Sequence, residues 1–222
     1  MNYKRHIKDL IHYRYVKEIC IIGNDLFNVV QKRIEPVLDL ADKEKFNLAC
    51  FIKSEESIAR KILLNLKPRA LEFLEQETYD EIDEAFEQEM KALDDVFRMN
   101  YELEVEQFED KVVEILGLLL KDNNDLSYGG KFKNKFSSET KGYKDLKVYL
   151  KYRDYLFEIQ FHTKESNALN KKTHGIYEVF RNMEPCDDRE SLKLDRDRLF
   201  EGLSVPDIHE DVIIGSIKEY GK

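Results

Sequence analysis

The feature that most constrains the fold is an alternation of apolar and polar residues in three neighbouring segments. KFKNKF at 131–136, DLKVYLKYR at 145–153 and YLFEIQFHT at 155–163 all repeat with a period of two. This period is typical of β-strands that bury one face. A tight turn near Arg153 and Asp154 is expected to join the last two segments as an antiparallel hairpin.

Two earlier segments, FNLACFI at 46–52 and VFRMNYEL at 96–103, also have strand character, and together the five segments predict a five-stranded mixed sheet. Most of the remaining chain has the three-and-four spacing of helices. The expected helices span 3–20 and 24–41, with Gly23 and Asn24 as the break, then Ser54 as N-cap to Pro68, 69–92 with an interruption near Thr78, 105–120, 164–184 and 188–202. Asn123–Gly130 is expected to be a loop.

These elements predict an α+β fold in which helices flank the mixed sheet. No internal repeat or clear linker is visible, so we expect one domain over 1–222. Within it we distinguish a helical N-terminal extension at 1–45, a core region at 46–182 and a C-terminal helical tail at 183–222.

Composition limits the compartment in which the chain works. Three cysteines, Cys20, Cys50 and Cys186, are odd in number and widely spaced, with no CxxC pair and no histidine at zinc-ligand spacing. This usage favours a reducing, cytoplasmic compartment. The longest apolar run, ILGLLL at 115–120, is far shorter than the roughly 20 residues that span a bilayer, so no membrane anchor is expected.

The net charge of −9 conceals two segments of opposite sign. Residues 71–114 carry 17 acidic and three basic side chains, whereas 131–153 carry eight basic and two acidic ones. The basic segment is either a solvated hairpin face or a site for an anionic ligand. The acidic helices are either a solvated insertion or a surface for a protein partner, and their charge disfavours broad nucleic-acid binding.

The last strand segment places three polar residues on one face. Glu158, Gln160 and His162 alternate with apolar residues that must point into the core. The polar face is therefore either solvated or the floor of a site. A carboxylate fixed on a strand beside a basic segment is suited to bind Mg²⁺ or to accept a proton from a hydroxyl nucleophile.

A second candidate site lies at the expected helix that follows Ser54. Lys53, Ser57 and Lys61 recur every four residues, which places two cations and a hydroxyl beside the free N–H groups of a helix N-terminus. This arrangement suits a polyphosphate. The pattern is weak by itself, because lysine-rich helices produce it by chance.

Five segments taken in order resemble a known family. FIKSEESIARK, DVFR, KGYKDLKVYL, FEIQFHT and HGIYEVFR look like the synthetase domain of the RelA/SpoT family over roughly 46–182. The resemblance implies a nucleotidyltransferase-like mixed sheet, Mg²⁺ as cofactor, and transfer of pyrophosphate from ATP to the 3′-hydroxyl of GDP or GTP, which makes an alarmone. FEIQFHT followed by H-x-x-Y-E is similar to a divergent branch of the family, seen also in proteins of phages and other mobile elements. Some toxin members of the family modify adenine nucleotides or the 3′ end of transfer RNA instead.

The resemblance also implies roles for individual residues. The segment that binds the ATP phosphates contains Lys53, Ser57, Arg60 and Lys61. Tyr143 matches the residue that stacks on the acceptor guanine, and Lys141 lies where a family lysine approaches phosphate. Glu158 and Asp95 match the catalytic Mg²⁺ ligands, and Glu158 would also activate the acceptor hydroxyl. The remaining nucleotide-binding candidates are Arg98, Gln160, His162 and His174.

The sequence departs from the family pattern at several positions. Phe51 stands where most synthetases have an arginine over the adenine, and an aromatic ring can also stack on a base. Asp94 competes with Asp95 for the role of metal ligand, because Asp95 lies only three residues before Arg98. His162 replaces an arginine. The chain has no His-Asp dipeptide, so the metal-dependent hydrolase half of the family is not expected here.

Three hypotheses from different classes follow. The first is an Mg²⁺-dependent nucleotide pyrophosphokinase that uses ATP and a nucleotide or RNA acceptor. The second is a catalytically inactive nucleotide-binding or regulatory module. The third is a structural protein of a mobile element that binds a partner through the acidic helices at 71–114.

Overall fold

The computed structural model describes residues 2–37, 51–75, 79–137 and 141–221. Their contacts divide into two compact units. The first contains Met1–Met99, Asn124–Gly129 and Tyr149–Glu158, and the second contains Asn100–Asn123, Gly130–Val148 and Ile159–Lys222. The boundary crosses all four strands of the sheet, so each unit holds part of every strand.

Four strands form one mixed sheet with the order β1-β4-β3-β2. The strands are β1 (Phe97–Leu103), β2 (Leu126–Asn134), β3 (Leu146–Tyr152) and β4 (Tyr155–Thr163). The α+β class is therefore confirmed, and the hairpin turn falls where it is expected, with Arg153 at a φ of 54°. The fifth strand is not confirmed. Residues 46–50 of that segment lie outside the described residues, and Ile52 makes an isolated antiparallel bridge to Phe97.

The expected loop at Asn123–Gly130 is wrong from Leu126 onward, because β2 begins there. Gly129 lies within this strand. A Cβ on Gly129 would lie 2.8 Å from the carbonyl oxygen of Tyr149, so glycine allows β2 to approach its neighbour closely at this point.

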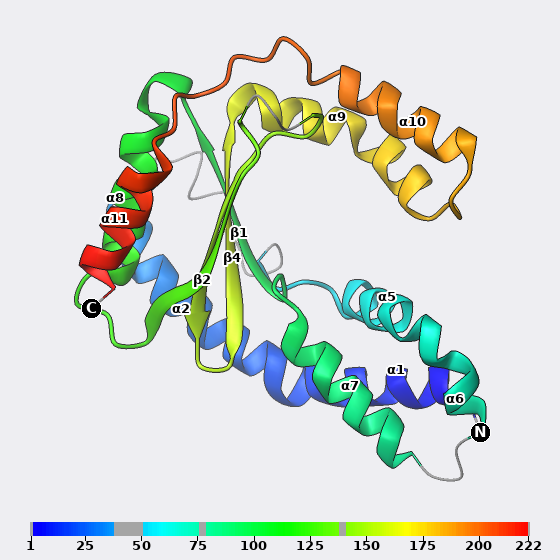
Figure 1. The fold of residues 1–222 in the computed structure, drawn as a ribbon. Coiled ribbons are helices and arrows are strands. Elements are labelled where there is room, and N and C mark those ends of the chain that lie inside the picture. The colour runs from blue at the N-terminus through cyan, green and yellow to red at the C-terminus, as the bar shows by residue number, and fades with distance from the viewer. Residues whose placement is uncertain (1, 38–50, 76–78, 138–140, 222) are drawn as a thin grey trace. The chain divides into compact units, whose positions relative to one another are not determined.

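The first unit contains helices that precede the sheet in sequence. They are α1 (Tyr3–Arg14), a π-helical turn (Tyr15–Ile19), α2 (Cys20–Ile34), α5 (Glu55–Leu66), α6 (Ala70–Glu75) and α7 (Asp80–Ala92), with 3₁₀ turns at Glu35–Val37 and Lys67–Arg69. Helix α1 packs against α5 and α7, as Figure 1 shows. Ser54 caps α5 as expected, since its side chain accepts a hydrogen bond from the backbone N–H of Ser57 at 3.3 Å.

The expected helix break at Gly23 and Asn24 is wrong, because α2 runs through both residues. Gly23 is buried, and a Cβ there would lie 2.5 Å from Ile52 Cδ1 and 2.9 Å from Phe97 Cε1. The glycine is therefore a packing requirement between α2 and the start of β1 rather than a helix terminator.

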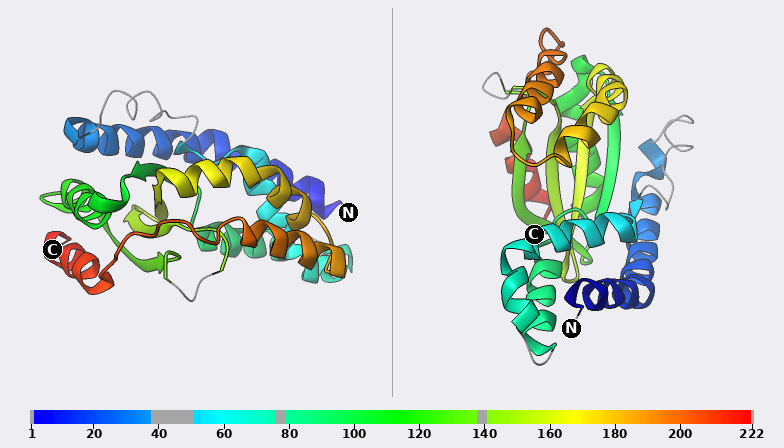
Figure 2. Two further views of the ribbon diagram at one scale, coloured as in Figure 1. Left: turned by 90° about the horizontal axis from the view of Figure 1, so that it is seen from above. Right: turned by 90° about the vertical axis from the view of Figure 1, so that its right-hand side faces the viewer.

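The second unit contains the helices that follow β1 and β4. They are α8 (Phe108–Leu120), preceded by a 3₁₀ turn (Val105–Gln107), α9 (Lys164–Arg181), α10 (Asp187–Arg198) and α11 (Glu210–Tyr220). Helix α11 packs on α8 and α10 packs on α9, which the views in Figures 1 and 2 both show. No helix among the described residues is long and apolar enough to cross a membrane.

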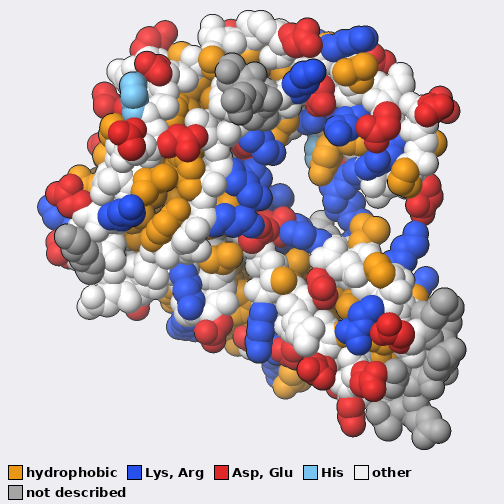
Figure 3. Space-filling model, viewed as in Figure 1, with side chains coloured by type: hydrophobic (Ala, Val, Ile, Leu, Met, Phe, Trp, Pro, Cys, Tyr) orange, Lys and Arg blue, Asp and Glu red, His pale blue; other side chains and the backbone are white. Residues whose placement is uncertain are grey.

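The two faces of β4 separate as the alternation predicts. Phe157, Ile159 and Phe161 are fully buried on the apolar face. On the polar face Glu158 and His162 are also buried, and Gln160 is half-buried, so the solvated-face interpretation is wrong for the first two. On the face in Figure 3, hydrophobic side chains are exposed in groups as well as singly, and many Lys and Arg side chains lie near the middle of the view.

Candidate nucleotide site

Three of the predicted site residues form one ionic cluster in the first unit. The Nζ atom of Lys53 lies 2.5 Å from Asp95 Oδ2, and Lys61 Nζ lies 3.0 Å from Asp95 Oδ1. Lys61 also approaches Asp94 Oδ1 at 3.4 Å. The backbone places these groups, because the Lys53 N–H donates to the carbonyl of Val96 at 2.8 Å and so holds the start of α5 beside the start of β1.

The cluster shifts the pKa of each member. Burial by itself would raise the pKa of Asp95, but the hydrogen bonds and charges of the two lysines hold it below its usual value. Burial lowers the pKa of Lys53 despite its bond to Asp95, with a smaller contribution from Arg98. Burial opposes the protonated form of Lys61 as well, but Asp95 and Asp94 raise its pKa. Asp95 therefore stays ionised between two cations.

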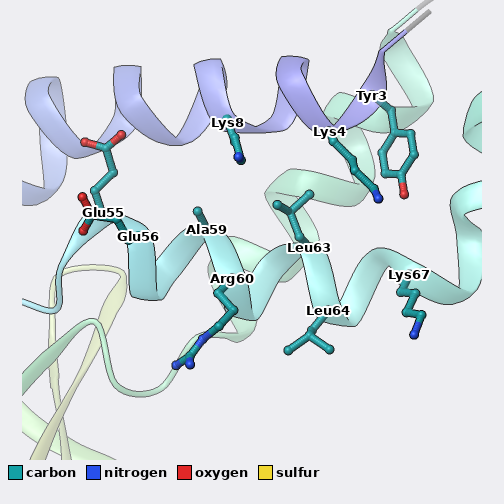
Figure 4. Close-up of a pocket in the computed structure, with 10 residues that line it drawn as sticks. All are labelled: Tyr3, Lys4, Lys8, Glu55, Glu56, Ala59, Arg60, Leu63, Leu64 and Lys67. Atoms are coloured by element: carbon teal, nitrogen blue, oxygen red, sulfur yellow. The ribbon is translucent and has the colours of Figure 1, made fainter. Parts of the chain in front are cut away.

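Ser57 and Arg60 extend this region along α5. Ser57 lies in the first turn, where its hydroxyl accepts a hydrogen bond from Ser54 Oγ at 3.2 Å. Arg60 lies on the wall of a groove of about 580 Å³ between α1 and α5, and Figure 4 shows its guanidinium pointing away from α1. The predicted role of Arg60 at the ATP phosphates stays a prediction.

Glu158 has a separate environment in the first unit. Its side chain is 3% exposed, and the hydroxyl of Tyr149 on β3 donates to Oε2 at 2.6 Å. Arg98 is exposed on β1, on the face opposite Phe97 and Met99. The sequence also favours one pocket shared by Glu158 and the lysines at 53, 61 and 141, and this convergence stays a prediction.

Phe51 does not match the expectation of a base-stacking ring. The side chain is 1% exposed and packs against the rings of Phe27, Phe97 and Phe157. It belongs to the hydrophobic core of the first unit, because the chain needs an apolar residue where α2 and the sheet meet.

The second unit brings Tyr143 and His162 together. Their ring centroids are 5.8 Å apart. Lys135 Nζ lies 5.0 Å from the Tyr143 centroid, and the guanidinium carbon of Arg196 lies 5.8 Å from it. Lys141 is exposed beside this ring, on a pocket of about 380 Å³. Tyr143 is therefore a half-buried ring within reach of two cations.

His162 and His174, the two histidines predicted to bind the nucleotide, lie in different surroundings. Burial lowers the pKa of His162 to about 4, with the charge of Lys147 as a further cause, so its ring is neutral at pH 7. A hydrogen bond joins this ring to the backbone of Lys144, and Nδ1 has no partner among the described residues. His174 is exposed on α9, where its ring centroid lies 6.2 Å from that of Tyr177 and its Nε2 lies 3.7 Å from the Glu178 carboxylate.

Sequence reasoning missed several residues that shape these sites. Tyr149 orients Glu158, and Arg196 lies over Tyr143. Asn167 and Lys171 on α9 bind the Glu102 carboxylate on β1, at 2.5 Å and 3.0 Å. The alternation of β3 places Tyr149 on the face of Lys147 and Lys151, which is the one signal in the sequence that distinguishes it from the other tyrosines.

The predicted site contains carboxylate side chains of the kind that binds Mg²⁺, but they form only part of a coordination shell. Carboxylate oxygens are preferred ligands of this ion, which usually takes one or two carboxylates and fills its shell with water and substrate phosphates. Asp95 and Glu158 supply such oxygens. Among the described residues, no group of three or more His, Cys, Asp or Glu side chains could hold a metal. A bound Mg²⁺ would therefore depend on the nucleotide for most of its ligands.

Comparisons with known proteins place the chain near several solved structures. No family model matches, and no curated protein matches. The chain is similar to the small alarmone synthetase 2 from Bacillus subtilis, with 17% identity, a TM-score of 0.48, and coverage of 93% of this chain and 99% of that one. It is also similar to smu.1046c from Streptococcus mutans, with 16% identity, a TM-score of 0.48, and coverage of 85% and 90%. A GTP pyrophosphokinase family protein from Streptococcus pneumoniae has 17% identity, a TM-score of 0.41, and coverage of 75% and 76%.

Proposed function

We propose that this chain is an Mg²⁺-dependent pyrophosphotransferase that moves pyrophosphate from ATP to a hydroxyl of a nucleotide acceptor. The acceptor class that the motifs favour is GDP or GTP, and the attacked group is the 3′-hydroxyl. The ordered motifs from FIKSEESIARK to HGIYEVFR support this assignment.

The observation that carries the proposal is the pairing of Lys53 and Lys61 with Asp95. Lys53 and Lys61 lie within 3.0 Å of the Asp95 carboxylate. Asp94, 3.4 Å from Lys61, supplies the second negative charge, so the charges of the cluster are already balanced. Phosphate oxygens of ATP would take the lysines from Asp95, and the freed carboxylate would become a ligand of Mg²⁺. This exchange keeps every buried charge paired before and after binding, which avoids the large cost of an unpaired buried charge.

Glu158 would act on the acceptor hydroxyl as a general base. The hydrogen bond from the Tyr149 hydroxyl holds one oxygen of the Glu158 carboxylate in place, which would orient this carboxylate as a base. Pyrophosphoryl transfer needs mainly positioning and neutralised phosphate charge. Bound Mg²⁺ would supply charge neutralisation at the phosphates.

The test is incubation of the full chain with β- and γ-labelled ATP, Mg²⁺ and each of GDP, GTP, ADP and transfer RNA. We expect label in a guanine nucleotide, and a loss of about 10²–10⁴-fold in Glu158→Gln, the range that a general base contributes. Glu165→Gln, at an exposed position of α9, is the matched control and should keep the parental rate. Failure of label to move to any acceptor would overturn the proposal.

The burial of Glu158 favours a second candidate, a nucleotide-binding module without catalysis. Calorimetric titration with ATP and a nonhydrolysable analogue separates the two. Heat of binding without any transfer would support the inactive module, whereas the absence of both would leave the partner-binding hypothesis.

A further inference from the structure

Helix α10 covers the predicted acceptor residue with a single side chain. Arg196 is the one buried residue of α10. Its guanidinium carbon lies 5.8 Å from the centroid of the Tyr143 ring and 5.2 Å from the centroids of Tyr177 and Phe200. A cation at these distances is attracted to the face of each ring. The contact therefore fastens the last turn of α10 to the loop that carries Tyr143.

The same turn also touches the backbone of that loop. Gly142 has a φ of 77°, and a Cβ built on it would lie 2.1 Å from Asp197 Oδ1. Only glycine allows the loop and α10 to approach so closely with this backbone conformation. The approach places α10 over the residue immediately before Tyr143.

The contact is weak enough to be released. Helix α10 buries no apolar side chain, and its Leu194 is 49% exposed. Arg196 Nη2 donates to Asn170 Oδ1 at 3.1 Å, but Nε is buried without a hydrogen-bond partner in the described residues, which disfavours the closed position. Elements with few buried apolar contacts open first. The next helix, α11, packs on α8 and does not depend on α10 for its place.

We propose that α10 is a lid over the acceptor-base site, and that a planar nucleotide base must displace Arg196 from Tyr143 in order to stack there. This inference rests on the proposed function, in which Tyr143 holds the acceptor base. A stacked base and the guanidinium compete because both use the π face of the same ring. Lys135, 5.0 Å from the ring centroid, stays as a cation beside the bound nucleotide after α10 moves.

The first test compares Arg196→Ala with the parent in the binding of a fluorescent GDP analogue and in transfer from ATP to GDP. Removal of the competing cation should raise the GDP affinity and kcat/KM for GDP by about tenfold. Without Arg196 a larger fraction of the molecules has α10 open and Tyr143 accessible, and only these molecules bind GDP. Lys193→Ala, at an exposed position of the same helix, is the matched control and should leave both unchanged. Equal melting temperatures of the variants show that the fold is intact.

A second variant separates the charge of Arg196 from the length of its side chain. Arg196→Lys keeps a cation that can lie over the Tyr143 ring, so it should gain less in GDP affinity than Arg196→Ala does.

The outcomes separate the lid from the proposed function. If Arg196→Ala binds GDP more tightly but no variant transfers label, the lid stands and the transferase assignment fails. If a folded Arg196→Ala binds GDP equally or more weakly than the parent, or if Arg196→Lys gains as much GDP affinity as Arg196→Ala, the lid is wrong whether or not transfer occurs. Absence of GDP binding by every variant also overturns it.

Discussion

Replacement of Asp95 by asparagine tests how much the ion pairs of Asp95 with Lys53 and Lys61 contribute to the free energy of unfolding. The substitution keeps the shape of the side chain and removes the charge that pairs Lys53 and Lys61. Lys53 is 11% exposed at its side chain, so the loss of one charged hydrogen bond should cost about 1.5–3 kcal/mol. The bond to Lys61, whose side chain is 37% exposed, should add less than about 1 kcal/mol after solvent screening. We expect a total of about 1.5–4 kcal/mol.

The assay is urea unfolding followed by circular dichroism at several pH values. Asp25→Asn is the matched control, since Asp25 pairs with Arg153 at 3.1 Å with both side chains about half exposed, and should cost less than about 1 kcal/mol. Because the folded-state pKa of Asp95 is lowered, its contribution is fully present above the unfolded value of about 4 and is lost as the pH falls through the folded value. The parent should therefore lose its advantage over Asp95→Asn only below about pH 4. An equal cost in both variants, or an advantage that persists at about pH 2, would refute the reasoning.

Three further predictions concern the core and the buried polar face. Gly23→Ala should destabilise the fold by about 1–3 kcal/mol in urea unfolding, because its Cβ has no room, whereas Gly215→Ala in α11, with open space around it, should stabilise by up to about 1 kcal/mol. Tyr149→Phe should cost about 1.5–3 kcal/mol by the same measurement and should slow transfer, because Glu158 loses its donor; a parental rate would contradict the positioning role. His162 has a folded pKa of about 4, so the unfolded state binds more protons between about pH 4 and 6.5 and stability should rise with pH there; a His162→Gln variant that keeps the same pH slope would contradict this.

Much of the fold follows from local pattern. Alternation located β3, β4 and their turn within a residue, because a half-buried strand leaves a period of two in any sequence that forms it. Ser54 also revealed the start of α5, since an N-cap acts through its own next three residues. The helix break at Gly23 was predicted wrongly, because close packing against a distant segment and a local turn both select glycine.

For the candidate site, too, some features follow from the sequence and others from the tertiary structure alone. The sequence by itself determined which residues carry charge, including Lys53, Lys61 and Asp95, and which strand face holds Glu158, because spacing within one element fixes a shared face. Only the tertiary structure decided that both lysines bind Asp95, that Tyr149 orients Glu158, and that Arg196 lies on the ring of Tyr143. These contacts join residues that are 9 to more than 50 positions apart, and their distances are set by how helices and strands pack, a property that no single segment of the chain contains.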